Sequence, residues 1–327
     1  MDEKILDVKD LTKYFEIHNG LFGKKKYVHA VEKVNFDLYK SETLGIVGES
    51  GSGKSTLGRV LLKLLEPTSG SVCYNGRDIM KLSSKDFGLI RRELQMVFQD
   101  PYASLNPRIK IGDAIAEPLM SNKIVSSYKE AKNEVYRLLD LVGLQAELYE
   151  RFPYEFSGGQ RQRISIARAL ALEPKVLVCD EAVSALDVSV QAQILNLFNS
   201  LKKKLDLTYL FISHDLSVVK HISDRIMVMY LGELMELAHT DEIFSKALHP
   251  YTEALISAIP DPQIRGKKKR IILEGDIPSP LDPPPGCRFA SRCIKAMDIC
   301  KTHHPEMVET EPKHFVRCHL YSQGKGV

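Results

Sequence analysis

The stretch Thr43-Leu-Gly-Ile-Val47-Gly48-Glu-Ser-Gly-Ser-Gly-Lys54-Ser55-Thr56 decides which fold the chain can adopt. It starts with an apolar run of strand length, and a helix is expected over 54–65, stopped by Glu66-Pro67. The glycines between them match the pattern G-x-x-x-x-G-K-[ST], in which backbone N–H groups and a helix N-terminus converge on phosphate oxygens. We expect Lys54 to reach the β- and γ-phosphates of a nucleotide and Ser55 to bind Mg²⁺. A glycine-rich turn without a ligand is the alternative.

Length and composition indicate a globular chain. With 327 residues, 44% of them apolar, there is room for one large domain and an appendage, or for two domains. The balance of 45 basic and 42 acidic residues gives no strong field to attract nucleic acid or an anionic membrane over the whole surface. The N-terminus lacks a signal-peptide core, and no apolar run approaches the ~20 residues of a membrane span. If the protein acts at a membrane, other chains must cross it.

The order of strand-like and helical stretches predicts an α/β fold. Strands expected at 176–179, 209–212 and 225–230 alternate with helical stretches such as 188–204, as in a parallel sheet. Residues 5–38 are strand-like with a loop at 19–26, and 112–172 have helical periodicity. After Pro260 a basic run, five prolines over 278–285 and a Cys- and His-rich tail indicate a linker and a small appended module.

Two adjacent carboxylates follow the apolar strand at 176–179. In an open α/β sheet, ligands bind at the carboxyl ends of the strands, where Asp180 and Glu181 are expected to lie. Asp180 suits a Mg²⁺ contact, and Glu181 suits the general base that activates an attacking water. Taken alone, the pair is more typical of an ordinary strand end with capping acids, but together with the phosphate loop it favours the catalytic interpretation.

A helix start rich in glycine occurs at Ser157-Gly158-Gly159-Gln160-Arg161. Serine followed three residues later by glutamine is a capping box, and the glycines leave the first amides of the helix open to an anion. The same residues also fit an ordinary start of the helix that runs to Leu172.

With these motifs in place, the sequence resembles the ABC transporter ATPases, whose signature Leu-Ser-Gly-Gly-Gln appears as Phe156-Ser157-Gly158-Gly159-Gln160. The resemblance implies a P-loop NTPase (RecA-like) core with an N-terminal antiparallel β subdomain, an α-helical signature subdomain and a small Cys-containing extension. It also implies a dimer in which the signature of one subunit closes over the γ-phosphate held by the other.

The resemblance assigns further residues. Gln99 matches the glutamine that senses Mg²⁺ and water, Ser184–Asp187 the D-loop, and His214 the switch histidine. Phe15, or else Tyr14, matches the aromatic that stacks on adenine, although a core aromatic fits equally well. The expected site comprises catalytic Glu181, His214 and Gln99; Mg²⁺ ligands Ser55, Gln99 and Asp180; ATP contacts Phe15, Gly48, Glu49, Ser50, Gly51, Ser52, Gly53, Lys54, Ser55 and Thr56; trans contacts Ser157, Gly158, Gly159 and Gln160; and D-loop Asp187.

Within that family the chain is similar to the oligopeptide/dipeptide importers, and most to the second of their two ATPases. The stretches that carry this likeness are Leu64–Gly70, Phe98–Pro107, Ser184–Ser189 and His249–Thr252, and Ala182 departs from the usual proline. The likeness implies an ATPase domain over 1–260, with its helical subdomain at about 105–172, and an extension over 261–327. It implies a heterodimer with a homologous ATPase, two permease subunits, an extracytoplasmic substrate-binding protein, and a peripheral position on the cytoplasmic face of the membrane.

Two other functions stay open at this point. A soluble ABC-type ATPase acting on nucleic acid or ribosomes usually has two cassettes or a long coiled coil, and the sequence has neither a second phosphate loop nor heptads. An importer for nickel or another small solute is the second alternative, because cargo is selected by other subunits.

Four cysteines, Cys287, Cys293, Cys300 and Cys318, cluster in a segment with few large apolar residues. Cytosolic chains seldom keep disulfides, so a ligated metal is favoured as the element that folds the tail. The spacing of five, six and seventeen residues matches neither zinc ribbons nor common ferredoxins. The resemblance implies a [4Fe–4S] cluster, with Zn²⁺, bare thiols or disulfides as alternatives.

Overall fold

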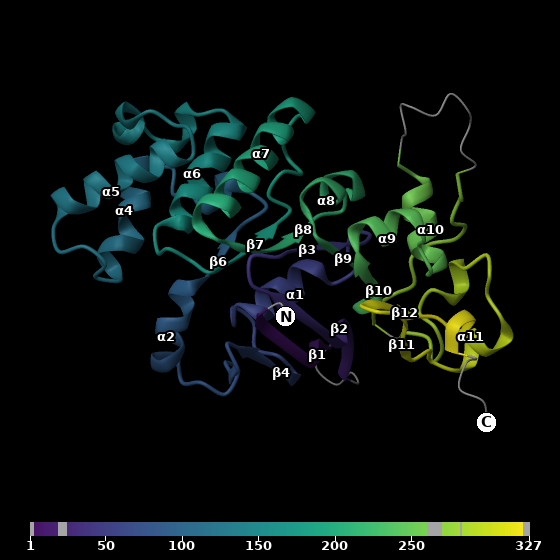
Figure 1. Ribbon diagram of the computed structural model, residues 1–327. Helices are drawn as coiled ribbons and strands as arrows, with labels where there is room; N and C mark the ends of the chain where they lie inside the picture. Colours follow the sequence, from purple (N-terminus) through teal and green to yellow (C-terminus); the bar gives the residue numbers. More distant parts are fainter. Residues whose placement is uncertain (1–2, 19–24, 260–269, 282, 323–327) are drawn as a thin grey trace. The chain divides into compact units, whose positions relative to one another are not determined.

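The computed structural model describes residues 3–18, 25–259, 270–281 and 283–322. The chain divides into two compact units, each described here by itself (Figure 1). Unit 1 is formed by Met1–Tyr39, Thr43–Met80 and Ser213–Val327, and unit 2 by Lys40–Glu42 and Lys81–Ile212.

Unit 1 contains the expected antiparallel β subdomain, with strands in the order β2-β1-β4-β5. The strands are β1 (Lys4–His18), β2 (Lys25–Tyr39), β4 (Ser69–Tyr74) and β5 (Arg77–Asp78). Inward residues of β1 and β2 such as Leu11, Val31 and Val34 are fully buried, and helix α1 (Lys54–Leu61) packs against these strands. The loop expected at 19–26 falls mostly outside the described residues.

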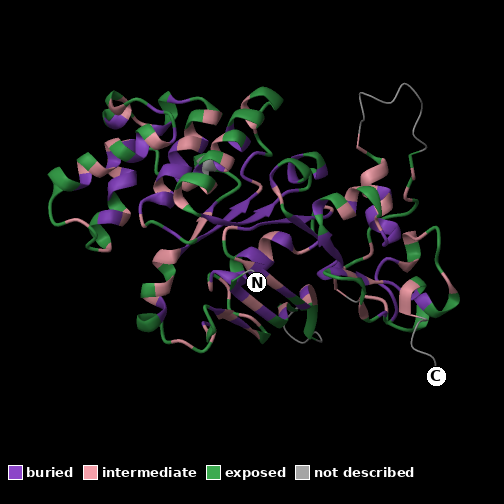
Figure 2. Ribbon diagram, in the orientation of Figure 1, coloured by how far each residue is buried: buried purple, intermediate pink, exposed green. Residues whose placement is uncertain are grey.

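The second sheet of unit 1 begins beside the phosphate loop and ends in the tail. Strand β3 (Thr43–Val47) pairs in parallel with β9 (Arg225–Tyr230), and both are buried throughout (Figure 2). Beyond β9 the sheet continues antiparallel through β10 (Glu233–His239), β12 (His314–Arg317) and β11 (Met307–Glu311). The tail therefore extends a sheet of the core. The helices of this part are α8 (Leu216–Ile222), α9 (Thr240–Ser245), α10 (Pro250–Ser257), η3 (Ala290–Arg292), α11 (Asp298–Thr302) and α12 (His319–Ser322).

Unit 2 combines three parallel strands with a helical layer. Strand β7 (Val176–Asp180) pairs with β6 (Leu94–Val97) on one side and β8 (Thr208–Ile212) on the other, and β7 and β8 are buried at every position. The helices are α2 (Ser84–Glu93), α3 (Pro101–Ser104), α4 (Ile111–Ser121), α5 (Tyr128–Leu141), η1 (Ala146–Glu150), η2 (Pro153–Glu155), α6 (Gly158–Leu170) and α7 (Val188–Leu205). Helices α4, α5 and α6 pack on one another and form the expected helical insert.

One expected boundary is wrong. The helix predicted over 54–65 ends at Leu61, because Lys63 takes a left-handed backbone conformation (φ 51°) and turns the chain. The Lys63 ammonium donates to the carbonyl oxygens of Ile79 and Met80, at 3.4 and 3.0 Å, which fixes this turn.

His249 gives the fold a predictable pH dependence. Its Nδ1 accepts the Tyr251 N–H at 3.0 Å and so caps α10, and burial lowers the pKa of the imidazole to about 4. The unfolded histidine binds a proton below about pH 6.5, so this contribution to stability is complete above that pH and is lost as the pH falls toward 4. At pH 5 the loss is about 2 kcal/mol.

Urea unfolding at pH 7 and pH 5 measures this loss. The variant His249→Asn keeps a capping acceptor but cannot titrate, so its stability should change less between the two pH values than that of the wild type. An equal change in both proteins would contradict the assignment.

Candidate nucleotide site

The phosphate loop has the backbone geometry that its glycines permit. Gly48 (φ 155°) lies so close to strand β9 that a Cβ atom there would stand 2.1 Å from the Met229 carbonyl oxygen. Gly53 (φ 97°) begins helix α1 and packs equally closely on the Ala30 carbonyl oxygen. No side-chain hydrogen bond caps the start of α1, and Ser50 and Gly51 of the preceding loop are exposed. This is the arrangement that binds phosphate.

Lys54 lies under this loop and is only 4% exposed. Its ammonium donates to the carbonyl oxygens of Gly48 and Glu49, at 2.8 and 2.9 Å, and to Ser52 Oγ at 3.2 Å. A cation held inside a ring of backbone dipoles is placed to meet an anion that binds over the loop.

Two aromatic residues of β1 were candidates for stacking on adenine. The hydroxyl of Tyr14 donates to Glu32 at 2.7 Å, and its ring lies 4.1 Å from the His29 ring. Phe15 is 37% exposed and pairs with Val28, two residues from the Ala30 carbonyl that Gly53 contacts. Of the two, Phe15 is the more exposed, and the Lys13 ammonium lies 5.0 Å from its ring centroid.

His214 follows strand β8 and precedes α8, and its side chain is exposed. The preceding residue, Ser213, donates its N–H to the Ile46 carbonyl oxygen at 3.0 Å, within unit 1. The backbone before the histidine is therefore held beside β3, the strand that leads into the phosphate loop.

The carboxylate pair lies at the end of β7, in unit 2. Asp180 is 1% exposed, whereas Glu181 is half-buried and has a left-handed backbone (φ 48°). The Glu181 N–H donates to the Ile212 carbonyl oxygen at 3.0 Å, which holds this conformation. Left-handed backbone at a non-glycine residue occurs preferentially at functional positions.

Gln99 lies beside Glu181. Strand β6 is parallel to β7, with Val97 opposite Cys179, so both residues follow adjacent strand ends. The Gln99 Nε2 donates to Glu181 Oε2 at 2.8 Å. The amide of Gln99 therefore orients the Glu181 carboxylate.

The signature residues start helix α6 in a capping box. Ser157 Oγ accepts the Gln160 N–H at 3.3 Å, and the Gln160 side chain accepts the Ser157 N–H at 3.0 Å. Ser157, Gly158 and Gln160 are exposed. A Cβ atom on Gly159 would stand 2.4 Å from Val190, so only glycine allows this approach to α7. The helix start therefore presents small residues and backbone amides to solvent.

The D-loop lies against this helix start. Asp187 begins α7, where its carboxylate accepts the Val190 N–H at 3.0 Å and the Ser189 hydroxyl at 2.7 Å. The Ser189 hydrogen bond, with the Val190 amide second, lowers the pKa of the Asp187 carboxyl. The next residue, Val188, is 83% exposed. Signature and D-loop thus form one exposed surface of unit 2 with an uncovered apolar side chain.

The structure accordingly distributes the predicted residues between the two units. Unit 1 holds Phe15, the loop Gly48–Thr56 and His214, and unit 2 holds Gln99, the 157–160 signature, the 180–181 carboxylates and Asp187. Within unit 2, Gln99 bonds to Glu181, and Gly159 of the signature packs on Val190 of the helix that Asp187 begins. Oxygen donors from Ser55, Gln99 and Asp180 are of the hard type that Mg²⁺ prefers, so the residue types fit that ion.

Two functional contacts had no counterpart in the sequence interpretation. Arg292 of the tail forms a bidentate ion pair with Glu49 of the phosphate loop, with N–O distances of 2.7 and 3.1 Å. Tyr251 of α10 accepts the Glu49 N–H at 3.0 Å. A spacing of 243 residues between Glu49 and Arg292 leaves no sequence signal for the ion pair.

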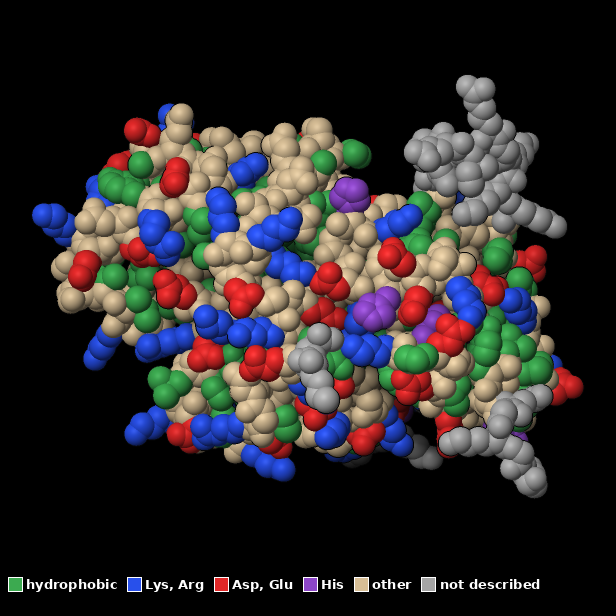
Figure 3. Space-filling view, in the orientation of Figure 1, with side chains coloured by type: hydrophobic (Ala, Val, Ile, Leu, Met, Phe, Trp, Pro, Cys, Tyr) green, Lys and Arg blue, Asp and Glu red, His purple; other side chains and the backbone are tan. Residues whose placement is uncertain are grey.

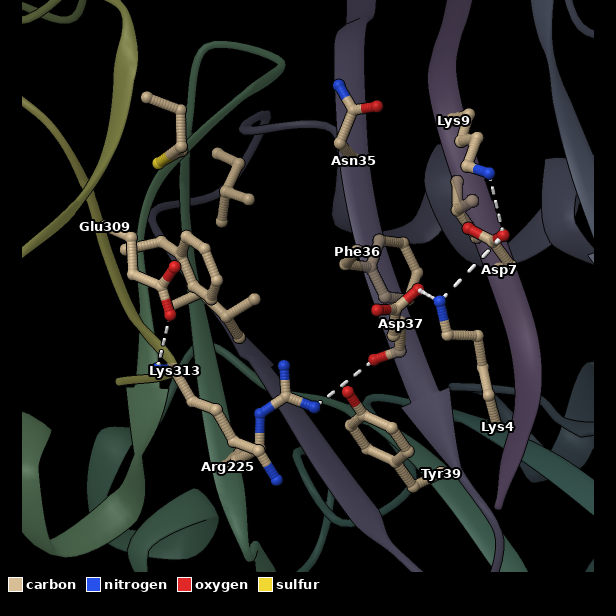
Figure 4. A pocket seen from close by; sticks show the side chains of 15 residues that line it. Lys4, Asp7, Lys9, Asn35, Phe36, Asp37, Tyr39, Arg225, Glu309 and Lys313 are labelled. Atoms are coloured by element: carbon tan, nitrogen blue, oxygen red, sulfur yellow. Dashed lines mark hydrogen bonds and ion pairs between the residues drawn. The ribbon is translucent and has the colours of Figure 1, made fainter. Parts of the chain in front are cut away.

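A pocket of about 530 Å³ lies elsewhere in unit 1, between strands β1 and β2 and the strands of the tail (Figure 4). The charged groups on its rim pair with one another: Lys4 with Asp37 at 2.7 Å and Lys9 with Asp7 at 3.0 Å. None of its lining residues belongs to the predicted nucleotide site.

Comparisons with known proteins identify relatives of this chain. The ABC transporter family model matches residues 31–184, and the model of the oligopeptide/dipeptide transporter C-terminal region matches residues 235–300. The oligopeptide transport ATP-binding protein AppF of Bacillus subtilis is 53% identical over 98% of both chains. The oligopeptide transport ATP-binding protein OppF and the dipeptide transport ATP-binding protein DppF of Haemophilus influenzae are 50% and 49% identical, over 97% and 96% of both chains. The chain belongs to the ABC transporter family.

Solved ABC structures share the fold. The ATP-binding cassette MJ0796, in a dimeric post-hydrolysis state bound to ADP and Pi, is 27% identical and superposes with a TM-score of 0.65. The superposition covers 72% of this chain and 99% of the MJ0796 chain. The expected P-loop NTPase core is confirmed.

The expected iron–sulfur cluster is wrong for this ABC protein. Among the described residues, no group of three or more Cys, His, Asp or Glu side chains is arranged to hold a metal ion. The printed names of the relatives describe peptide transport and no cluster. All six cysteines are free thiols.

Packing explains how the tail folds without a metal. Cys287, Cys293 and Cys300 pack in an apolar cluster around Phe289, whereas Cys318 packs with Leu248 in another. Burial raises the pKa of Cys287 to about 12 and of Cys318 to about 11. The cysteine-containing segment was predicted to need a metal because it has few large apolar residues, but it packs against apolar residues of the core instead.

Three histidines of the tail also have partners in the structure. His304 bonds to Glu233 at 2.7 Å, His314 to Glu236 at 2.8 Å, and His319 to the His303 carbonyl oxygen at 2.9 Å. The His304 and His314 contacts attach the tail to strand β10, and the His319 contact lies within the tail.

Proposed function

We propose that this chain binds and hydrolyses ATP to drive the import of oligopeptides or dipeptides across a membrane. ATP hydrolysis coupled to transport is the activity of the ABC family to which it belongs. The observation that carries the proposal is the phosphate loop around buried Lys54, in a chain 53% identical over 98% of its length to an oligopeptide transport ATP-binding protein.

The residues of the site suggest a division of labour. Lys54 and the loop amides bind the β- and γ-phosphates, and Ser55, Gln99 and Asp180 would hold Mg²⁺, which neutralises charge developing on the phosphates. Glu181, oriented by Gln99, accepts a proton from water as the water oxygen bonds to the γ-phosphorus. The bond from the γ-phosphorus to the bridging oxygen breaks, leaving ADP, and His214 contacts the transferred phosphoryl group.

Dimer closure is the proposed link to transport. The exposed signature and D-loop of one subunit would cover ATP held by the loop of another, so ATP favours the closed dimer by the free energy of those added contacts. The dimeric MJ0796 cassette supports this assembly by analogy. We propose a heterodimer with a second, homologous ATPase.

The remaining parts follow from the same proposal. No helix within the described ranges is long and apolar enough to span a membrane. Two permease subunits and an extracytoplasmic binding protein would supply the pathway and the cargo, with this chain peripheral on the cytoplasmic face. The ATPase domain would span 1–260, with its helical subdomain at about 105–172, and the extension 261–327.

The two alternative functions have less support. The names of these relatives, which match over nearly the full chain, describe peptide transport, and they mention neither nickel nor nucleic acid. On the face drawn in Figure 3, basic side chains are interspersed with acidic ones, unlike the single-sign surface of many nucleic-acid-binding proteins.

Uptake measurements in cells that lack this chain test the function. Wild-type protein should restore accumulation of a labelled tripeptide, and Glu181→Gln protein at equal abundance should not. Accumulation of labelled nickel instead would favour the solute alternative. Purification from detergent extracts with RNA and without hydrophobic subunits would contradict the importer assignment.

A further inference from the structure

A buried aromatic cluster attaches the cysteine-rich tail to the strand that lies beside the phosphate loop. Phe289 is 1% exposed and packs between Tyr230 of β9 and Tyr251 of α10, with ring centroids 5.3 and 5.2 Å away. This packing places helix η3, and Arg292 at its end, next to the start of the loop.

Arg292 reaches the loop itself. Its guanidinium holds both carboxylate oxygens of Glu49, at 2.7 and 3.1 Å, and also contacts the Tyr230 hydroxyl at 3.4 Å. The arginine side chain is 9% exposed and that of Glu49 is 25% exposed. Paired, two-point hydrogen bonding of this kind fixes orientation as well as charge.

Arg288, four residues earlier, is linked to the loop indirectly, through Leu231 and Gly232. It pairs with Glu233 at 2.9 Å and Glu32 at 2.8 Å, and it donates to the Leu231 carbonyl oxygen. The adjacent Gly232 N–H donates to the Ser52 carbonyl oxygen at 2.9 Å. The tail therefore contacts the loop directly through Arg292 at Glu49, and indirectly through Arg288 and Gly232 at Ser52.

The ion pair between Arg292 and Glu49 can affect nucleotide binding because Glu49 carries a negative charge. A carboxylate in a phosphate-binding loop repels the polyphosphate that the loop binds, and the repulsion is strong where solvent is partly excluded. The Arg292 guanidinium offsets that charge and also holds the first residue after Gly48.

We propose that Arg292 is a positioning residue for ATP binding, through which the tail and the nucleotide site stabilise each other. The proposal rests on the proposed function, because it assumes that ATP occupies this loop. Removing Arg292 leaves an unpaired carboxylate beside the phosphates. Because coupling between two sites is reciprocal, bound ATP should in turn protect the tail from local opening.

A double-mutant cycle tests the electrostatic part in the full chain, with equilibrium ATP binding measured in the Glu181→Gln background to prevent turnover. Arg292→Ala should weaken ATP binding about tenfold or more, and the loss should be smaller for ADP and smallest for AMP. Adding Glu49→Gln to Arg292→Ala should restore affinity to within about threefold of the parent.

Control variants separate this role from simple loss of structure. Lys295→Ala removes an ion pair to Glu253 in the same part of the tail and should leave ATP affinity unchanged. Hydrogen exchange over 287–300 should slow on ATP addition in the parent and not in Arg292→Ala. Weak binding that Glu49→Gln fails to rescue would overturn the proposal, as would wild-type affinity in Arg292→Ala. If the parent itself bound no ATP, the proposed function would fail instead.

Discussion

Glu181→Gln is expected to retain ATP binding while its hydrolysis rate falls about 10²- to 10⁴-fold, the range that general-base catalysis contributes. The amide cannot accept the proton of the attacking water, but it has the shape of the carboxylate and can still bond to Gln99, which lies 2.8 Å away. Phosphate release under steady-state conditions gives the rate, and a fluorescent ATP analogue gives the affinity.

The same variant tests dimer closure. If ATP holds the closed form and hydrolysis releases it, Glu181→Gln should accumulate an ATP-dependent dimer in gel filtration, together with its homologous partner subunit. Glu147→Gln is the matched control, because Glu147 is an exposed carboxylate of unit 2 in η1. Turnover of Glu181→Gln within about threefold of the wild type would remove Glu181 as the base, since that is far below the effect of a lost general base.

Local sequence was sufficient for the parts of the site that lie within one strand–turn–helix. The order of strand, glycine loop and Lys54 predicted a backbone geometry that the structure contains, because glycine at 48 and 53 is required by close backbone contacts. The capping box at Ser157 was predicted for the same reason, since all its hydrogen bonds lie within four residues. The roles of Gln99 and His214 came from family resemblance alone.

Contacts between distant segments were not predictable. Strand β12 adds to the edge of β10, where buried Glu236 accepts from the Leu248 and His249 amides and bonds to His314. Charged residues usually lie at the surface, so the sequence alone does not predict that Glu236 is fully buried. The sequence does not reveal that β12 pairs with β10, so a bound metal was predicted to fold the tail, and the four cysteines were interpreted as its ligands.

Some signals were present but unused. Helix α2 begins at Ser83, whose hydroxyl accepts the Asp86 N–H at 3.2 Å. Serine followed three residues later by an acid is a common start of a helix, so this pattern alone predicts the beginning of α2. The tail arginines carry no such pattern, because their partners Glu32, Glu49 and Glu233 lie far away in the chain.

Lys54→Ala is expected to raise the dissociation constant for ATP about 10- to 100-fold, the loss expected for a hydrogen bond to a charged group. The ammonium is buried among loop carbonyls and its removal also leaves those oxygens unpaired, so the loop should bind every phosphorylated nucleotide less tightly. Titration calorimetry with ATP and ADP measures the change. Lys85→Ala, an exposed position in α2, is the control.

Lys54→Arg separates charge from geometry. The cavity that holds the ammonium leaves only 4% of Lys54 exposed, and a planar guanidinium cannot enter it without moving the Gly48 or Glu49 carbonyl. We therefore expect Lys54→Arg to bind ATP nearly as weakly as Lys54→Ala, although its net charge is unchanged. Full affinity in Lys54→Arg would mean that a positive charge near the loop is sufficient, whereas full affinity in Lys54→Ala would mean that nucleotide does not bind over this loop. Because Glu181→Gln leaves binding intact and Lys54→Ala weakens it, the two variants together assign binding and hydrolysis to different units of the chain.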